Sequence, residues 1–545
     1  MDYSNDLGYK RRGIWRALAR IPPTTLVPAT PPAPRRSLLL LAALVAVSGL
    51  TRLVVANADV INVDEASYMV GASSLLQGHL PYTAFGDNKP PLIYLYFAFS
   101  QLLAGQGIAA VRLVTALLTV PLTAFGVSAF YRHDRRGIVG ALLLIVYGVS
   151  FRVSDMLAVN CEVVMMLPLA WSLVAVRDSE QAQRPERVFL AGLLAGLAML
   201  VKYQAVLWLP PLALAVLVAH GTTRWSGLVR AGVAMALGVA TPILLTTTVF
   251  AALGGLDGFV YWNLTHNVEY MQNPVTAMQA LTRGLEQGLP FLAVTSLLWV
   301  GWFRSSRDGQ TRYWDVLVAG LVGASAAAAC LGFRFFPHYF IQLYVPLAIA
   351  AAPWTARLLT PPVLLRGWVT AAVTVAIAVG WTVDHDRRLQ SRVLARLNAT
   401  PMDVATRLKQ DSCYGGSSMF VWGSAPEFYY HAGLLPATQF FFPEYPLVRY
   451  YAGNPSATTR HARAGRRPRR VRHWTRLMSD LRRARPTYIL DTAASGIARW
   501  QDFPMRDYPM LHRYTERNYH QVDTIDGVTI YRRNGCEAEA RNEVR

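Results

Sequence analysis

The sequence predicts a polytopic α-helical membrane protein with a small α/β domain in its C-terminal part. Three observations predict this fold class. Only 16% of the 545 residues are charged and 53% are hydrophobic, whereas soluble proteins carry about 25% charged residues. Apolar runs recur at about the 20 residues that an α-helix needs to cross a bilayer. From about Asp384 the composition becomes that of a soluble protein.

The apolar runs divide most of the chain into membrane spans. They include Ser37–Ala58, Val188–Ala219, Gly227–Leu253, Trp314–Gly332 and Trp368–Val383. The run "PPLIYLYFAFSQLLAG" is expected to lie along the membrane surface, with a full span at about Ile108 to Tyr131 after it. Counting that run as a span would place the basic loop "YRHDRRG" outside, although basic loops stay on the cytoplasmic side. We therefore expect about 11 to 13 transmembrane helices, with the C-terminus outside.

The net charge of +20 does not indicate nucleic acid, and we expect no nucleic-acid partner. Most arginines sit between apolar runs, where they set the topology and contact lipid headgroups. Residues 1–36 are basic and rich in proline, which predicts a disordered cytoplasmic arm. The run Ser37–Ala58 is too long for a cleavable signal peptide. The expected domains are this arm, a transmembrane domain at 37–384 and an extracytoplasmic domain at 385–545.

The C-terminal part alternates short β-like runs with helical stretches, as an α/β domain does. The β-like runs are "SSMFVWG", "PTYILDT" and "GVTIYRR", and "VRHWTRLMSDLRRA" is typical of a helix. The basic segment "TTRHARAGRRPRRVRH" is expected to be a mobile loop that touches anionic lipid or glycan. Cys413 and Cys536 could form a disulfide if this domain faces an oxidising compartment.

The loops sort by composition to the two sides of the membrane. Arginine-rich loops fall inside, and loops with unusual polar residues fall outside. On the outer side lie Asp64, Glu65, Lys89, Asp155, Glu162, Lys202, Arg334, His338 and Tyr339. Placing a charged side chain at a membrane edge costs free energy, so such residues are first interpreted as parts of a functional site. Each of them alone is explained about equally well as a paired structural charge and as a catalytic residue. Their collection on one side of the membrane indicates a site.

The first outer loop, "NVDEASYMVGASSLLQGHLPYTAFGDNKPPLIY", carries the strongest pattern. Its start has the apolar spacing of an amphipathic helix lying on the bilayer, which Gly78 would end. Asp64 is then either the N-cap of this helix or a functional carboxylate, and the two roles need not compete. Lys89 is held extended by Pro90 and is either a lysine that snorkels to the interface or a phosphate contact.

These residue types suit one chemistry. A carboxylate can act as general base toward an acceptor hydroxyl. Lysine and arginine can neutralise a phosphate that leaves as an anion. Interfacial helices would let a lipid-linked substrate enter sideways from the bilayer. The combination fits transfer of a sugar from a polyprenyl-phosphate carrier to an extracytoplasmic acceptor.

The first outer loop also resembles that of the GT-C superfamily of membrane glycosyltransferases. It is most similar to bacterial relatives of protein O-mannosyltransferases and of the lipid A aminoarabinose transferase. In those proteins an acid begins the loop, here Asp64, "G-x-x-P-Y" follows at Gly78–Tyr82, and "K-P-P-L" closes it at Lys89–Leu92. Weaker resemblances are carried by "GLAMLVKYQAV", "FFPHYFIQLYVPLAI" and "FVWGSAPEFYYHAGLLPATQFFF".

The resemblance implies a role for each candidate residue. Asp64 becomes the base or the carboxylate that orients the acceptor, with Glu65 beside it, and Lys89 contacts the donor phosphate or sugar. Glu162 and Asp155 compete for a second acidic position, and we favour Glu162. The phosphate site would be lined by Lys202, Arg334, His338 and Tyr339.

The expected activity is that of an inverting, polyprenyl-phosphate-sugar-dependent glycosyltransferase of the plasma membrane. The chain has no room for the luminal sugar-binding modules of protein O-mannosyltransferases, so we expect a lipid or cell-surface glycan as acceptor. Asp64 and Glu65 could bind a divalent ion, but no further ligands at suitable spacing accompany them. The alternatives are a transporter or flippase for lipid-linked glycans, a polymerase or ligase with a pyrophosphate-linked donor, and a membrane scaffold. A transporter would need polar residues within its spans and internal repeats, and the sequence shows neither.

Overall fold

The computed structural model describes residues 34–182, 184–220, 225–271, 275–306, 312–359, 397–414, 418–443 and 467–536. The described residues form two compact units, one from those within residues 1–57, 109–246 and 275–387, the other from those within residues 58–108, 247–274 and 388–545. The first outer loop thus groups with the C-terminal part. The domain limits expected from composition remain predictions. Residues 1–33 of the expected arm at 1–36 and the run Trp368–Val383 lie outside the described residues, and residues 34–36 begin the first described helix.

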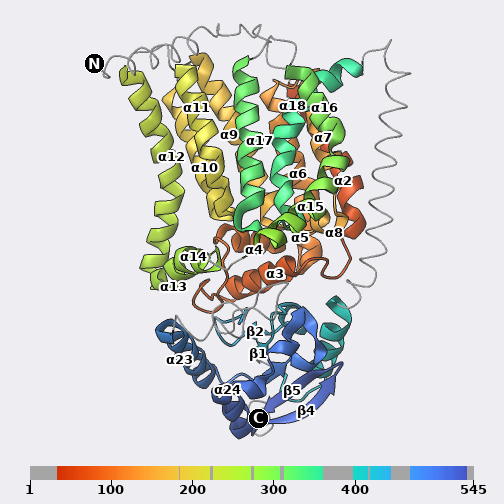
Figure 1. Ribbon diagram of the computed structural model, residues 1–545, viewed down its shortest axis with the longest axis vertical. Helices are drawn as coiled ribbons and strands as arrows, with labels where there is room; N and C mark the ends of the chain where they lie inside the picture. Colours follow the sequence, from red (N-terminus) through yellow and green to blue (C-terminus); the bar gives the residue numbers. More distant parts are fainter. Residues whose placement is uncertain are drawn as a thin grey trace. The chain divides into compact units, whose positions relative to one another are not determined.

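The first unit is a bundle of helices that run side by side (Figure 1). Its main helices are α2 (Pro34–Arg52), α5 (Ile108–Val114), α6 (Val120–Phe130), α7 (Arg135–Tyr147), α9 (Cys161–Ala182), α10 (Pro185–Val201), α11 (Leu209–His220), most of α12 (Trp225–Ala252), α15 (Ala277–Val294), α16 (Ser296–Ser306), α17 (Arg312–Cys330) and α18 (Tyr344–Leu358). Short pieces connect them: α8 (Val153–Leu157), Tyr203–Trp208, Leu331–Phe333 and Pro337–Leu343.

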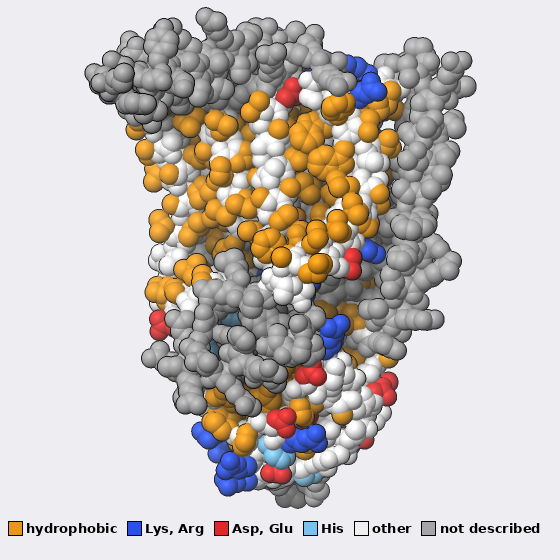
Figure 2. Space-filling view, viewed as in Figure 1, with side chains coloured by type: hydrophobic (Ala, Val, Ile, Leu, Met, Phe, Trp, Pro, Cys, Tyr) orange, Lys and Arg blue, Asp and Glu red, His pale blue; other side chains and the backbone are white. Residues whose placement is uncertain are grey.

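Five helices in the described part of the chain are long and apolar enough to cross a membrane. They comprise Pro34–Val55, Ile108–Phe130, Ser226–Ala252, Trp314–Phe333 and Pro337–Leu358. The visible face of the bundle is covered with hydrophobic side chains (Figure 2), and large apolar residues such as Leu50, Leu244 and Leu245 are 78%, 63% and 65% exposed. A soluble protein rarely exposes so much apolar surface. The expected polytopic membrane protein is therefore confirmed, while the expected number of spans remains a prediction.

Glycines let two helices of the bundle approach closely. A Cβ on Gly192 of α10 would lie 2.3 Å from the carbonyl oxygen of Met235 in α12, and one on Gly238 of α12 would lie 2.2 Å from that of Phe189 in α10. Small residues at such crossings are typical of helix packing in membranes, where tight van der Waals contact replaces the hydrophobic effect.

The first outer loop forms two helices of the second unit, α3 (Val63–Leu76) and α4 (Leu92–Ala104). Gly78 follows the end of α3 with φ of +83°, as expected. α4 has 13 residues, about 20 Å at 1.5 Å per residue. That length is short of the roughly 30 Å of a hydrocarbon core, which agrees with a helix that does not span the membrane.

Two details of α3 differ from expectation. Asn62 is the N-cap, because its side chain accepts a hydrogen bond from the backbone N–H of Asp64 at 2.9 Å. Asp64 therefore lies in the first turn and is not the cap. The helix also lacks a single apolar face, since every residue from Glu65 to Ala72 is buried. Packing against α4 and the C-terminal part covers sides that the sequence pattern assigned to solvent.

The remaining helices of the second unit come from two further parts of the chain. Residues 256–271 form α13 (Leu256–Val260), a single π-type turn at Tyr261–Thr265 and α14 (His266–Met271). The C-terminal part contributes α20 (Glu427–Ala432), α23 (Arg467–Ala484) and α24 (Pro509–Asn518).

A five-stranded sheet confirms the expected α/β character of the C-terminal part. Its order is β2-β1-β3-β5-β4, with β1 at Ser418–Trp422, β2 at Leu435–Pro436, β3 at Tyr488–Asp491, β4 at Tyr519–Ile525 and β5 at Val528–Arg533. β1 pairs in parallel with β2 and β3, whereas β5 is antiparallel to β3 and β4. The three β-like runs in the sequence are β1, β3 and β5. Most of the expected basic loop lies outside the described residues, and its end belongs to α23.

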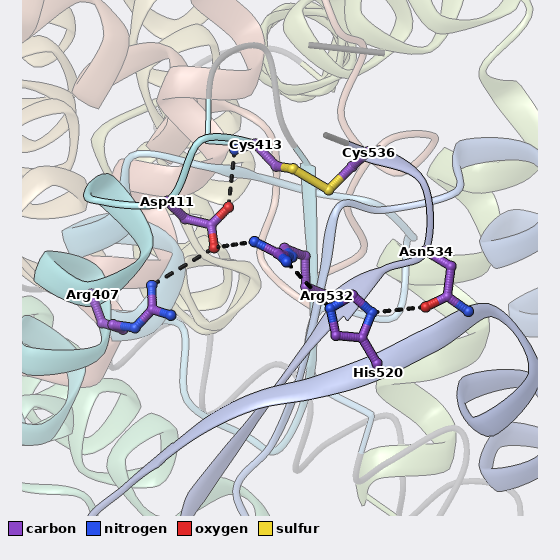
Figure 3. Close-up of a disulfide and its surroundings, with 7 residues drawn as sticks. All are labelled: Arg407, Asp411, Cys413, His520, Arg532, Asn534 and Cys536. Atoms are coloured by element: carbon purple, nitrogen blue, oxygen red, sulfur yellow. Dashed lines mark hydrogen bonds and ion pairs between the residues drawn. A yellow bond between two sulfur atoms is a disulfide. The ribbon is translucent and has the colours of Figure 1, made fainter. Parts of the chain in front are cut away.

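A disulfide joins Cys413 to Cys536, with Cα atoms 5.9 Å apart and a sequence separation of 123 positions (Figure 3). Beside it, Asp411 accepts hydrogen bonds from the backbone N–H of Cys413 at 2.9 Å and from Arg532 Nη1 at 3.0 Å. Burial opposes ionisation of Asp411, but these donors and the charge of Arg532 hold its pKa below the usual range. Disulfides persist in oxidising compartments.

Candidate active site

Lys89 lies at the centre of a polar group in the second unit. Its ammonium donates a hydrogen bond to Asn88 Oδ1 at 2.9 Å and lies 4.0 Å from Asp87 Oδ1. Asp87 is itself fixed by the hydroxyl of Tyr94 at 2.9 Å. The hydroxyl of Tyr82 donates to the backbone carbonyl of Lys89 at 2.7 Å. Because both its backbone and its ammonium are held while the side chain is 20% exposed, Lys89 is a positioned cation that an anionic ligand can reach.

Asp64 is connected to the same group through Tyr68. The Tyr68 hydroxyl donates to Asp64 Oδ2 at 3.2 Å, and Lys89 Nζ lies 5.9 Å from the centroid of the Tyr68 ring. Asp64 is partly exposed, whereas Glu65 is completely buried within α3. Of the two adjacent acids, Asp64 is therefore the one that a substrate can reach.

A third segment of the second unit contacts the backbone next to Lys89. Asn267 Nδ2 donates to the backbone carbonyl of Asn88 at 3.1 Å. Its neighbour His266 is 4% exposed, and burial, helped by the charges of His473 and Lys89, lowers the pKa of His266 to about 4. His266 is therefore neutral at physiological pH, which adds no positive charge beside Lys89.

The first unit holds a buried ion pair between two of the predicted residues. Glu162 lies in the first turn of α9, and Lys202 directly follows α10 with an extended backbone. Their side chains, 1% and 9% exposed, form a hydrogen-bonded ion pair. The partial charges of helix ends favour an acid at the start of α9 and a cation at the end of α10. Lys202 Nζ also lies 4.3 Å from the ring centroid of Tyr339.

The remaining predicted residues of the first unit lie on neighbouring turns. His338 Nδ1 and Asp155 Oδ1 are 3.1 Å apart, with the His338 side chain 8% exposed and that of Asp155 21% exposed. Arg334 lies in the sequence between the 3-10 segments Leu331–Phe333 and Pro337–Leu343, and 9% of its surface is exposed. The predicted residues thus form two groups. Asp64, Glu65 and Lys89 belong to the second unit, and Asp155, Glu162, Lys202, Arg334, His338 and Tyr339 belong to the first.

Sequence reasoning missed several residues that hold the predicted ones. Tyr68 lies four residues after Asp64, a spacing that places both on one side of a helix and could have identified it. Asp87 and Asn88 stand directly before Lys89 in "DNKPPL". Asn267, by contrast, is 178 positions from Lys89 in the sequence, and no local pattern indicates it.

The described residues contain no group of three or more histidine, cysteine, aspartate or glutamate side chains that could hold a metal ion. The arrangement around Lys89 instead offers one cation, the accessible carboxylate of Asp64, the buried carboxylate of Asp87 and neutral hydrogen-bonding groups. Such a set can bind a phosphate and accept a proton from a hydroxyl.

One family model matches part of the chain. Residues 88–254 match the family model for dolichyl-phosphate-mannose-protein mannosyltransferases, a stretch that contains Lys89, Asp155, Glu162 and Lys202. No curated protein matches the chain in sequence.

Solved structures resemble the chain over most of its length. ArnT from Cupriavidus metallidurans bound to undecaprenyl phosphate has a TM-score of 0.54 at 14% identity, covering 92% of this chain and 98% of that one. The apo state of the same protein has a TM-score of 0.54 at 13% identity, covering 91% of this chain and 97% of that one. A third structure is that of the archaeal oligosaccharyltransferase AglB from Archaeoglobus fulgidus, in complex with an inhibitory peptide and a dolichol-phosphate. Its TM-score is 0.48 at 12% identity, covering 92% of this chain and 74% of that one.

At these identities the likeness to ArnT concerns the fold. It extends over the membrane part and the C-terminal part together, and it agrees with the resemblance that the first outer loop carries. The chain has the fold of the GT-C membrane glycosyltransferases.

Proposed function

We propose that this protein is an inverting glycosyltransferase that moves a sugar from a polyprenyl-phosphate donor to an extracytoplasmic lipid or glycan acceptor. The observation that carries the proposal is the group around Lys89, where a positioned cation and an accessible carboxylate are connected through one tyrosine. The fold likeness to an ArnT bound to undecaprenyl phosphate supports a polyprenyl-phosphate ligand. The active site and the C-terminal domain would face the cell exterior, which the disulfide Cys413–Cys536 supports.

In this proposal Asp64 takes the proton of the acceptor hydroxyl as that oxygen attacks the anomeric carbon of the sugar. The bond from this carbon to the phosphate oxygen breaks, and the lipid phosphate leaves as an anion. Lys89 neutralises the charge that develops on it. A phosphate leaves without being protonated, so the mechanism needs no general acid.

For the first-unit residues we propose more specific roles than the sequence suggested. Glu162 and Lys202 are buried against each other, so Glu162 holds Lys202 in place. Asp155 is more exposed than Glu162, so within the first unit we give it the role of the second acidic residue that the resemblance implies. His338 would orient Asp155, and Tyr339 would hold Lys202 through the face of its ring.

The test is release of lipid phosphate by the purified protein in liposomes supplied with a panel of polyprenyl-phosphate sugars and candidate acceptors. At least one donor should be consumed. Asp64→Asn should lower its turnover about 10²–10⁴-fold, the usual contribution of a general base. Asp507→Asn, which removes an exposed acid 4.0 Å from Arg506, is the matched control and should be neutral. Failure to consume any donor, or full activity of Asp64→Asn, would contradict the proposal.

A further inference from the structure

Tyr68 stands between the two residues that the proposed reaction needs. Its hydroxyl donates to Asp64 Oδ2 at 3.2 Å, and the face of its ring receives the ammonium of Lys89 at 5.9 Å from the centroid. One side chain therefore contacts the carboxylate through its polar end and the cation through its aromatic face. A ring within about 6 Å of a cation attracts it electrostatically.

The Tyr68 ring is fixed in this position by its surroundings. It is 1% exposed and packs edge to face against Phe97 at 5.3 Å and Tyr94 at 6.2 Å, both on α4. Gly71, one turn later on α3, makes this packing possible, since a Cβ there would lie 2.5 Å from the Tyr94 ring. A ring held between two helices in this way can determine where its partners lie.

We propose that Tyr68 is a positioning residue that couples Asp64 to Lys89, an inference that rests on the proposed function. The hydroxyl holds the carboxylate of Asp64 in one orientation, and the ring holds the Lys89 ammonium over the same helix. The two parts of one side chain thus affect different steps. The hydroxyl affects proton acceptance and hence kcat, whereas the ring affects binding of the lipid phosphate.

Two variants separate these parts. Tyr68→Phe removes the hydroxyl and keeps the ring, so kcat should fall about 10-fold while the Kd for undecaprenyl phosphate stays within 2-fold. Tyr68→Leu also removes the ring, so that Kd should rise about 3- to 30-fold, in line with the range measured for cation–π contacts. Tyr519→Phe is the matched control, because it removes a buried hydroxyl that donates to the carbonyl of Pro486 in the C-terminal sheet. It should change neither kcat nor Kd.

A measurement that needs no turnover tests the coupling to Asp64. If the hydroxyl and the carboxylate interact, the losses in melting temperature of Tyr68→Phe and Asp64→Ala overlap, and the double variant loses clearly less than their sum. Additive losses would overturn the inference, as would equal effects of Tyr68→Phe and Tyr68→Leu on binding. Absence of turnover in the unmodified protein would instead contradict the proposed function, and the binding and melting data would still decide the role of Tyr68.

Discussion

The buried pair of Glu162 and Lys202 gives the sharpest prediction on stability. Replacing Glu162 by Gln keeps the shape of the side chain but leaves the Lys202 ammonium buried, 9% exposed, without its carboxylate. Breaking a buried ion pair by removing one partner costs about 3–5 kcal/mol. Domains of 150–250 residues lose about 2–4 °C in melting temperature per kcal/mol. We therefore expect Glu162→Gln, and likewise Lys202→Met, to melt roughly 6–20 °C lower.

The double variant Glu162→Gln, Lys202→Met should recover most of this loss. It removes both charges, and a buried ion pair replaced by neutral groups of similar size is often neutral in stability or even stabilising. The assay is thermal unfolding of the purified variants in one detergent, followed by tryptophan fluorescence. Asp507→Asn, which breaks a highly exposed contact with Arg506, is the control and should shift the melting temperature by less than about 4 °C.

Two results would refute the reasoning. Single variants that melt within about 2 °C of the unmodified protein would show that the pair adds nothing to stability. Additive losses in the double variant would show that the two side chains do not stabilise each other. A double variant that is stable but no longer binds undecaprenyl phosphate would show that the pair also takes part in binding this lipid.

Three further predictions concern the second unit. Cys413 and Cys536 are 123 positions apart in the sequence, so reducing their disulfide should destabilise the C-terminal part by up to about 5 kcal/mol by the chain-entropy estimate. A variant with serine at both positions should melt alike with and without reductant. Burial raises the pKa of Glu427 to about 8, so the folded state favours the neutral carboxyl group. The folded state therefore loses stability as pH rises from about 4.5 to 8. Glu427→Gln should stabilise the protein at pH 8 but little at pH 5. Asn267→Ala removes the hydrogen bond to the Asn88 carbonyl and should weaken undecaprenyl phosphate binding several-fold with little loss of melting temperature; unchanged binding would exclude a role in holding Lys89.

The sequence predicted the elements whose signal is local. Long apolar runs identified membrane helices because a bilayer demands about 20 apolar residues from each span. Alternating β-branched and aromatic residues identified β1, β3 and β5, whereas β4 was missed, since "YHQVDTI" is mostly polar. The break at Lys202 was also visible locally, because one charge interrupts an apolar run.

The partners of the site residues came only from the tertiary structure. That Glu162 pairs with Lys202, His338 with Asp155 and Asn267 with the Lys89 segment depends on contacts between residues far apart in the chain. The capping of α3 by Asn62, and not by Asp64, was equally undecided, because both are good N-cap residues and packing selects where a helix begins. The sequence by itself determined the membrane fold and the α/β character of the C-terminal part, and it supplied the residues of the candidate site. Only the folded chain decided which of those residues are buried pairs and which remain open to a substrate, since burial and pairing arise when distant segments meet.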